Sequence, residues 1–335
     1  MGNKAWSIVF GVVMLACFVG FAISPFVGWW RPEGRSTHSD DVDFLFDVIL
    51  YITAFFFVLT EAILVAFMWK YAGTGDMKHP VSEKAEFPGM MKPLANLLHD
   101  QHRVELAWTF IPAVILLYIA FAQVETWANI KYASRNQVED LSKNPYAAAT
   151  GKALHHQIAV SARQFEWRMR YPSSARLKKW LAEPGESKSD HRSFGKVPQA
   201  DDVLVVNELH VWQGYPVNVH LSTRDVIHSF NLPNFRVKQD ALPGKLIPLW
   251  FTPKGSKDKS HNCVWDQTKN RYVDGINPDT GKHDPAFIYD IPCAELCGWG
   301  HYRMIGRVFV HKDQAQFQDW LAKAESYHRQ RTGDR

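Results

Sequence analysis

Cysteine is scarce in this chain, with four residues among 335. No C-x-x-C-H motif occurs, which excludes covalent haem attachment through that motif. Two of the four cysteines nevertheless stand close together, in the run Cys-Ala-Glu-Leu-Cys-Gly-Trp-Gly-His-Tyr-Arg-Met over residues 293–304. A group this dense in sulfur and imidazole side chains, in a chain with so little cysteine, indicates a metal site.

The candidate ligands are two thiolates, two imidazoles and a thioether. Cys293, Cys297, His301 and Met304 belong to the run, and His228 lies upstream in Asp-Val-Ile-His-Ser-Phe. Copper electron-transfer sites use this mixture of soft sulfur and imidazole ligands. A closed zinc site is the alternative, although the tight C-x₂-C spacing of zinc knuckles is absent and zinc has no use for a thioether. A disulfide between the two cysteines is a third interpretation, because the compartment inferred below is oxidising.

Charge is missing from long stretches of the first 125 residues. Mean hydropathy is only −0.24 although 46% of the residues are hydrophobic, so the apolar residues must be concentrated. They form runs over residues 6–30, 44–69 and 106–124, and only the second contains acidic residues, Asp47 and Glu61. Each run reaches the roughly 20 residues that a membrane-spanning helix needs. The sequence therefore predicts transmembrane helices within residues 1–125 and an external domain over residues 126–335.

Basic residues predict the orientation. The loop 70–105 carries five of them and the loop 31–43 two. By the positive-inside rule the longer loop is cytoplasmic, which places the external domain in the periplasm of a bacterial inner membrane. The first run also resembles a cleaved leader, because Lys4 precedes it and residues 14–17 form a weak lipobox. Its apolar character continues to Trp30, which favours a retained span, so the number of spans is two or three.

Short alternating segments in the external domain predict a β-sandwich or barrel. The predicted strands are Gln164–Tyr171, Val203–Val206, Val217–Leu221, Leu246–Phe251 and Gly306–Val310. Residues 312–328 have helical spacing, with Phe317, Trp320 and Leu321 on one face. His155 and His156 belong to no motif and are expected at the surface.

These motifs together resemble subunit II of the haem-copper cytochrome c oxidases. The family pattern C-x-E-x-C-x₃-H-x₂-M matches residues 293–304, and D-V-x-H-S matches residues 225–229. Residues 104–112, 164–167 and 238–244 also match, so the resemblance covers most of residues 43–322. It implies an α+β membrane protein in which transmembrane helices precede a cupredoxin-like Greek-key β-barrel.

The resemblance also implies a binuclear copper centre, CuA. Cys293 and Cys297 would bridge both coppers. His228 and Met304 would complete one copper, and His301 with the backbone carbonyl of Glu295 would complete the other. The Glu295 carboxylate would reach a magnesium ion shared with subunit I, while haem would be bound only by that partner.

The implied function is electron entry into a respiratory oxidase. A c-type cytochrome would reduce CuA, and the electron would pass to haem in subunit I, where oxygen is reduced to water with proton translocation. Glu105 matches the entrance of the family's K proton pathway, although it also suits the start of a helix. The alternatives are the CuA subunit of a nitric oxide reductase, or a membrane-anchored copper carrier or assembly factor. No feature suggests a nucleic-acid partner.

Two features depart from the family. Phe165 stands where the family has the tryptophan at which electrons enter, while Trp167 keeps the second aromatic of that strand. Residues 126–335 hold 30 basic and 22 acidic residues, a net charge of +8. A basic domain repels a basic cytochrome c at long range, so an acidic or tethered donor is expected.

Two polar stretches, 173–199 and 253–286, are expected outside the core. The second separates His228 from Cys293 and is interpreted as an insertion on the copper side of the barrel. It is either a solvated loop or a docking surface for another subunit or the donor. Cys263 within it is expected to be a free, inert thiol.

Overall fold

The computed structural model describes residues 3–27, 29–70, 101–136, 156–182, 190, 193–255 and 260–332. The chain divides into two compact units. The first comprises Met1–Arg31 and Phe44–Glu125, and the second comprises Pro32–Asp43 and Thr126–Arg335. The segment between the first two predicted spans therefore belongs with the β domain.

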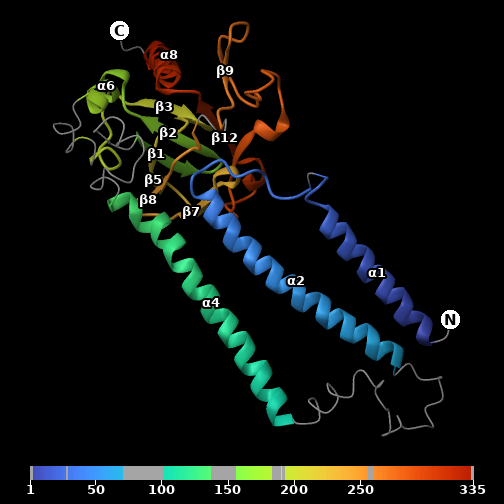
Figure 1. Cartoon of the computed structure of the whole chain (residues 1–335). Helices are drawn as coiled ribbons and strands as arrows, with labels where there is room; N and C mark the ends of the chain where they lie inside the picture. The colour runs from blue at the N-terminus through green and yellow to red at the C-terminus, as the bar shows by residue number, and fades with distance from the viewer. Residues whose placement is uncertain are drawn as a thin grey trace. The chain divides into compact units, whose positions relative to one another are not determined.

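Among the residues that the structure describes, three helices are long and apolar enough to cross a membrane (Figure 1). They are α1 (Asn3–Ile23), α2 (Ser39–Lys70) and α4 (Gln101–Asn136), and each contains a window of mean hydropathy 2.0 or above. The first helix ends at Ile23 rather than near Trp30, because Pro25 disfavours helical backbone in the residue before it. The basic residues of 71–100, on which the predicted orientation depends, lie outside the described residues.

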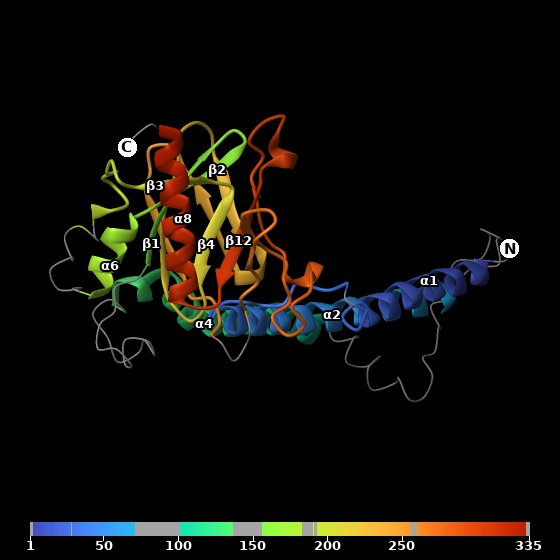
Figure 2. The same cartoon turned by 90° about the horizontal axis from the view of Figure 1, so that it is seen from above.

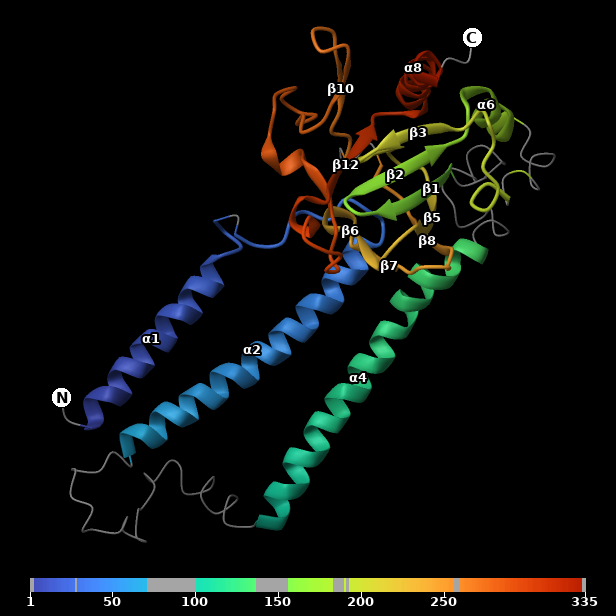
Figure 3. The same ribbon diagram turned by 180° about the vertical axis from the view of Figure 1, so that it is seen from behind.

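The described part of the β domain contains four sheets (Figure 3). A five-stranded sheet has the order β3-β2-β1-β5-β8, formed by Val203–Val206, Glu166–Tyr171, His156–Arg163, Val217–Thr223 and Ile247–Phe251. A three-stranded sheet has the order β11-β12-β4, formed by Tyr289–Pro292, Ile305–His311 and Glu208–Trp212. Two hairpins complete the domain, β6 (His228–Leu232) with β7 (Val237–Ala241) and β9 (Val264–Asp266) with β10 (Arg271–Val273).

Alternation along the strands explains the core. In β2, Trp167, Met169 and Tyr171 are fully buried, while the intervening arginines are half-buried. The strand thus lies between the core on one side and solvent on the other. Helix α8 (Gln314–Thr332) lies across β3, β4 and β12 (Figure 2) and buries its predicted apolar face. Three transmembrane-type helices followed by this β domain confirm the predicted fold class.

Two predictions about the domain's surface are wrong. The stretch 173–199 contributes to the core, because helix α6 (Ser174–Ala182) buries Leu177 and Trp180 at helical i, i+3 spacing and Phe194 is also buried. His156 is buried as the first residue of β1, where its ring contacts Trp212. His156 is buried because β1 pairs with β5, and no local sequence motif predicts that pairing. His155 lies outside the described residues.

The polar segment 253–286 is also tied into the domain. The Asn262 side chain is buried, donates to the carbonyls of Phe287 and Val308, and accepts from the Val310 N–H. Tyr272, in the β9–β10 hairpin, donates its hydroxyl to Asp319 of α8. The described part of the segment is therefore a hairpin anchored at its base rather than a simple solvated loop. Cys263 is buried and free, as predicted.

Residues 32–38, before α2 begins at Ser39, are held against the β domain by backbone hydrogen bonds. Ser36 pairs with Pro253 in an antiparallel bridge, and Thr37 N–H donates to the carbonyl of Thr252 at 3.0 Å. Arg236, in the turn between β6 and β7, forms an ion pair with Asp43 at 2.7 Å. These contacts fix the turn of the hairpin whose first residue is His228.

Candidate metal centre

His228 is the first residue of β6 and is completely buried. Its Nε2 lies 2.8 Å from Asp225 Oδ1, so Nε2 carries the hydrogen and donates it to the carboxylate. The lone pair of Nδ1 is then available to bind a metal. Nδ1 lies 3.9 Å from the sulfur of Cys293. A carboxylate behind an imidazole fixes its tautomer and orientation in many metal sites. Sequence reasoning quoted Asp225 in a motif but did not give it this role.

Burial raises the pKa of Asp225, but hydrogen bonds from Gln164, His228 and Val226 outweigh it and hold that pKa below its usual value. The carboxylate therefore stays charged at neutral pH. It accepts from the Gln164 backbone N–H at 2.7 Å, while the Gln164 side-chain amide donates to the Cys297 carbonyl at 2.6 Å. The Asp225 carboxylate thus joins His228 to the turn between β1 and β2, and the Gln164 side chain joins that turn to the loop that contains Cys297.

A closed loop supplies the other candidate ligands. Cys293 directly follows β11 and Met304 directly precedes β12, and these strands pair antiparallel. The Cys293 N–H donates to the Met304 carbonyl at 3.0 Å and closes the loop at its base. The Ala294 N–H donates to the Ser229 carbonyl at 3.0 Å, which places the loop beside His228. Sheet pairing therefore brings together residues that are far apart in sequence.

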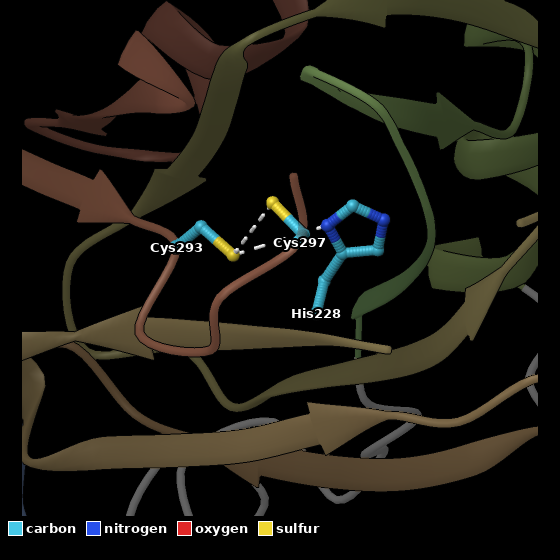
Figure 4. A group of neighbouring side chains, drawn as sticks. All are labelled: His228, Cys293 and Cys297. Atoms are coloured by element: carbon cyan, nitrogen blue, oxygen red, sulfur yellow. Dashed lines mark hydrogen bonds between the residues drawn. The ribbon is translucent and has the colours of Figure 1, made fainter. Parts of the chain in front are cut away.

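The sulfur and nitrogen atoms converge on a small volume. His228, Cys293 and Cys297 point toward one another, and their ligand atoms all lie within 4.8 Å (Figure 4). The two cysteine sulfurs are 3.8 Å apart. Cys297 Sγ lies 3.5 Å from His301 Nδ1 and 3.9 Å from Met304 Sδ. The two thiols are thus central and the other ligands surround them.

Glu295 offers its backbone rather than its side chain to this cluster. Its carbonyl oxygen lies 3.2 Å from the sulfur of Cys293. Its side chain is exposed at the surface of the domain. Atoms of all six predicted ligands therefore lie in or beside this cluster.

The donor set fits a copper centre. Both cysteines are free thiols, which disfavours the disulfide interpretation. Burial, followed by the neighbouring Cys293, raises the pKa of Cys297 to about 12, so a metal must displace the thiol proton when it binds. A closed zinc site needs four ligands, whereas here a buried thioether and a carbonyl oxygen also face the thiols. Thiolate, imidazole and thioether together favour copper.

Glycine is required where the loop packs under the β1–β2 turn. A Cβ on Gly298 would lie 2.7 Å from Gln164 Nε2, and its φ of +122° disfavours any other residue. A Cβ on Gly300 would collide with the ring of Phe165. The loop is therefore held by close backbone approach on one side and by hydrogen bonds on the other.

The two predicted electron-entry residues differ in exposure. Trp167 is fully buried, donates its indole N–H to the Ile291 carbonyl, and lies edge-on to the His228 ring at 6.1 Å. It does not reach the surface. Phe165 is half-buried and contacts Trp299 edge-on with ring centroids 5.2 Å apart.

Glu105 and Glu61 are carboxylates on the membrane-type helices α4 and α2. Glu105 is exposed in the second turn of α4. Glu61 of α2 is half-buried, and among the described residues its Oε2 has no hydrogen-bond partner. An isolated carboxyl at this depth of an apolar helix is costly and usually faces protein.

Two family models match the chain. The model for the transmembrane domain of cytochrome c oxidase subunit II matches residues 27–125, and the model for its periplasmic domain matches residues 158–257. The second match ends before the loop 293–304. The loop is therefore identified by its own sequence and geometry.

Curated relatives agree with these matches. Cytochrome c oxidase subunit 2 of Thermostichus vulcanus is 26% identical over 94% of this chain and 84% of its own length. An alternative cytochrome c oxidase subunit 2 of Bradyrhizobium diazoefficiens is 31% identical over 38% of this chain and 35% of its own. A crystal structure of the periplasmic domain of subunit II of a cytochrome oxidase from Bradyrhizobium japonicum is similar over 51% of this chain and 94% of its own, at 20% identity. Its TM-score of 0.33 is too low to support an argument. The two family models and the full-length relative show that the chain belongs to the cytochrome c oxidase subunit II family.

Proposed function

We propose that the cluster holds a binuclear copper centre, CuA, with Cys293 and Cys297 as bridging ligands. The supporting observation is that the two buried sulfurs face each other at 3.8 Å, with imidazole nitrogens close to each of them. His228 and Met304 would complete one copper, and His301 with the Glu295 carbonyl the other. When bound, the pair of metals supplies a site that gains and loses one electron with little structural change.

Membership of the family gives the chain its wider role. It is the electron-transferring subunit of a haem-copper cytochrome c oxidase, a membrane protein with three candidate spans. The family implies a copper centre, and this chain supplies a histidine and two cysteines that can hold it. The protein residues serve the reaction by rigidity. Asp225 fixes His228, and the closed loop fixes the two thiols, so the ligands hold one geometry in both redox states.

Metal analysis of the full chain, purified in detergent without its partner subunits and loaded with copper, tests this proposal. We expect two coppers per chain and an electron paramagnetic resonance spectrum of one unpaired electron shared equally by two copper nuclei. One bound zinc, or one copper with a mononuclear spectrum, would contradict the binuclear centre.

We also propose that the Glu295 carboxylate contributes to a magnesium site shared with subunit I, as the family resemblance implies. Its side chain is exposed while its carbonyl faces the cluster, so the two groups are free to serve different metals. Haem would then lie only in subunit I. The proposed location is a bacterial inner membrane with the copper domain in the periplasm.

Glu105 is proposed to load the K proton pathway of subunit I. Its carboxylate is exposed on α4 near the start of the span that begins at Val104. In the purified oxidase, Glu105→Ala should slow reduction of the oxygen site severalfold while leaving reduction of the copper centre by its donor unchanged. Stopped-flow spectroscopy of both steps measures this. Glu125→Ala, an exposed carboxylate on the same helix, is the matched control and should change neither. Full turnover in Glu105→Ala would leave Glu105 as a helix-start residue only.

The donor is proposed to be an acidic or tethered c-type cytochrome. Residues 126–335 carry a net charge of +8. Like charge repels a basic cytochrome at long range, and raised salt screens that repulsion. Electron transfer from a basic cytochrome c should therefore rise with ionic strength.

A further inference from the structure

The candidate copper loop presents large apolar side chains to solvent. Leu296, Trp299 and Tyr302 are 78%, 75% and 76% exposed. All three lie between Cys293 and Met304, in a loop whose ligand side chains are buried or half-buried. Clustered exposed apolar side chains are uncommon on a soluble surface and mark interaction sites. The loop therefore has an inner face of ligands and an outer face suited to contact with another molecule.

Trp299 is the most firmly positioned of the three. Its ring packs edge-on against Phe165 at 5.2 Å, and the Arg303 guanidinium lies over it at 4.4 Å from the ring centroid. Arg303 also lies 5.7 Å from the Phe165 ring. A cation over an indole face is attractive and limits the motion of both side chains. Trp299 is thus exposed but already ordered, which lowers the entropy lost when a partner binds.

The covalent position of Trp299 suits electron entry. It lies two residues after Cys297 and two before His301, so few bonds separate its indole from two candidate ligands. Trp167 is fully buried and cannot touch a partner, and Phe165 is half-covered. Among the aromatic residues that the structure describes beside the cluster, Trp299 combines high exposure with contact to Phe165 and proximity to the ligands.

The charge directly beside Trp299 is the positive charge of Arg303, while the loop's exposed carboxylate, Glu295, lies four residues before Trp299 in the sequence. Arg303 is exposed, and the contacts that position its guanidinium are with the rings of Trp299 and Phe165. The nearby Asp225 carboxylate is already engaged by Gln164, Val226 and His228. Tryptophan and arginine are also the residue types that contribute most often to binding energy at protein interfaces. An acidic partner surface complements this pair.

We propose that Trp299 is the aromatic contact at which a c-type cytochrome docks its haem edge, and that Arg303 makes this contact selective for an acidic cytochrome. The proposal rests on the copper centre of the proposed function. One electron leaves the ferrous haem of the donor, which becomes ferric, and reduces the copper centre by one electron. No proton is transferred and no bond forms or breaks. The loop thus carries both the ligands and the donor contact.

Stopped-flow reduction of the copper centre in the purified oxidase tests the proposal, with an acidic c-type cytochrome as the probe. Trp299→Ser should lower the second-order rate constant roughly tenfold or more, the size expected of an interface hot spot. Tyr302→Ser removes a second exposed ring from the same loop and should lower it less than about threefold, and Tyr327→Ser, an exposed ring of α8 outside the loop, is the control and should leave it unchanged. Arg303→Glu should lower the low-salt rate with the acidic probe and raise it with a basic cytochrome c.

The copper spectrum of each variant distinguishes failure of the proposed copper centre from failure of the proposed docking role of Trp299. A wild-type protein without the shared-electron spectrum would overturn the proposed function itself. If the spectrum is present and unchanged in every variant, a wild-type rate in Trp299→Ser overturns the docking role. Equal losses in Trp299→Ser and Tyr302→Ser would show a diffuse apolar surface, for a cytochrome or another oxidase subunit, and would also overturn it. Unchanged salt dependence in Arg303→Glu would overturn the selectivity.

Discussion

Replacing Cys297 with serine is expected to abolish the shared-electron spectrum of the copper-loaded chain. The Cys297 sulfur lies 3.8 Å from Cys293 Sγ, 3.5 Å from His301 Nδ1 and 3.9 Å from Met304 Sδ, so it stands at the centre of the cluster. A serine hydroxyl is a harder and weaker ligand than a thiolate and does not replace a soft bridge between two coppers. Electron paramagnetic resonance and visible absorption, with copper counted per chain, measure the loss.

Cys263→Ser is the matched control. Cys263 is also buried and free, but its sulfur lies near Val310 and His311 rather than in the cluster. This variant should keep both the copper content and the spectrum. An unchanged spectrum in Cys297→Ser, or an equal loss in Cys263→Ser, would show that the cluster does not hold the metal through bridging thiolates.

The ligand set could be read from sequence because most of it is local. Cys293, Cys297, His301 and Met304 lie within one loop, where spacing alone predicts proximity. His228 is distant in sequence, and only the family motif identified it as a ligand. The structure supplies the reason, because Phe230 of β6 pairs with Cys293 at the start of the loop. The strand positions of the external domain were predicted where apolar and polar residues alternate, as in β2 and β5, and β3 was predicted from an uninterrupted apolar run.

Contacts made between distant segments could not be predicted. Residues 32–38 carry no pattern that predicts a contact with the β domain, and the bridge from Ser36 to Pro253 depends on backbone pairing that requires no particular side chain. The role of Asp225 depends on the turn that brings Gln164 within 2.7 Å of it. The exposed position of Trp299 depends on close packing of Gly298 and Gly300 under the β1–β2 turn. In each case the information lies in tertiary geometry rather than in local pattern.

Two buried histidines form the clearest feature that the sequence did not signal. His210 Nδ1 lies 3.0 Å from His311 Nε2, and both rings are fully buried. His210 stacks between Phe309, at 4.3 Å, and Trp320 of α8, at 3.7 Å between ring centroids. The pair therefore joins β4 and β12 to the C-terminal helix through flat contacts between neutral rings. A charge on either ring would be poorly solvated there.

The groups around this pair come from several elements. Glu208 of β4 lies 3.4 Å from His210 Nε2, and Cys263 lies 3.7 Å from His311 Nδ1. Burial lowers the pKa of both histidines well below the usual value. His210 further lowers the pKa of His311, while Gln316 and Asp319 of α8 oppose that effect. Burial raises the pKa of Glu208. Where this carboxyl titrates, at lower pH than histidine, the folded chain binds the proton more tightly than the unfolded chain, so the effect of Glu208 on stability opposes that of the histidines.

The β domain is therefore expected to lose stability as the pH falls below about 6.5, the ordinary pKa of histidine. Between that value and the lowered folded pKa, the unfolded chain binds protons that the folded chain does not, so stability rises with pH through this window. Within this window, each histidine that stays neutral in the folded chain lowers the stability by about 1.4 kcal/mol per pH unit, or roughly 3–6 °C in Tm for a domain of this size. Two such histidines make this a large effect.

Thermal unfolding of the detergent-purified chain, followed by tryptophan fluorescence between pH 7.5 and 5, tests this expectation. His311→Phe removes one titrating ring while keeping a flat side chain. It should lower Tm at pH 7.5 but roughly halve the fall in Tm between pH 7.5 and 5, because one of two linked groups is gone. His283→Phe, an exposed histidine in the segment 253–286, is the control and should keep the wild-type fall. Acid also releases copper from its histidine ligands, but that loss is common to all three proteins and cancels in the comparison. If His311→Phe keeps the full wild-type fall in Tm, protonation of the buried pair does not drive acid unfolding.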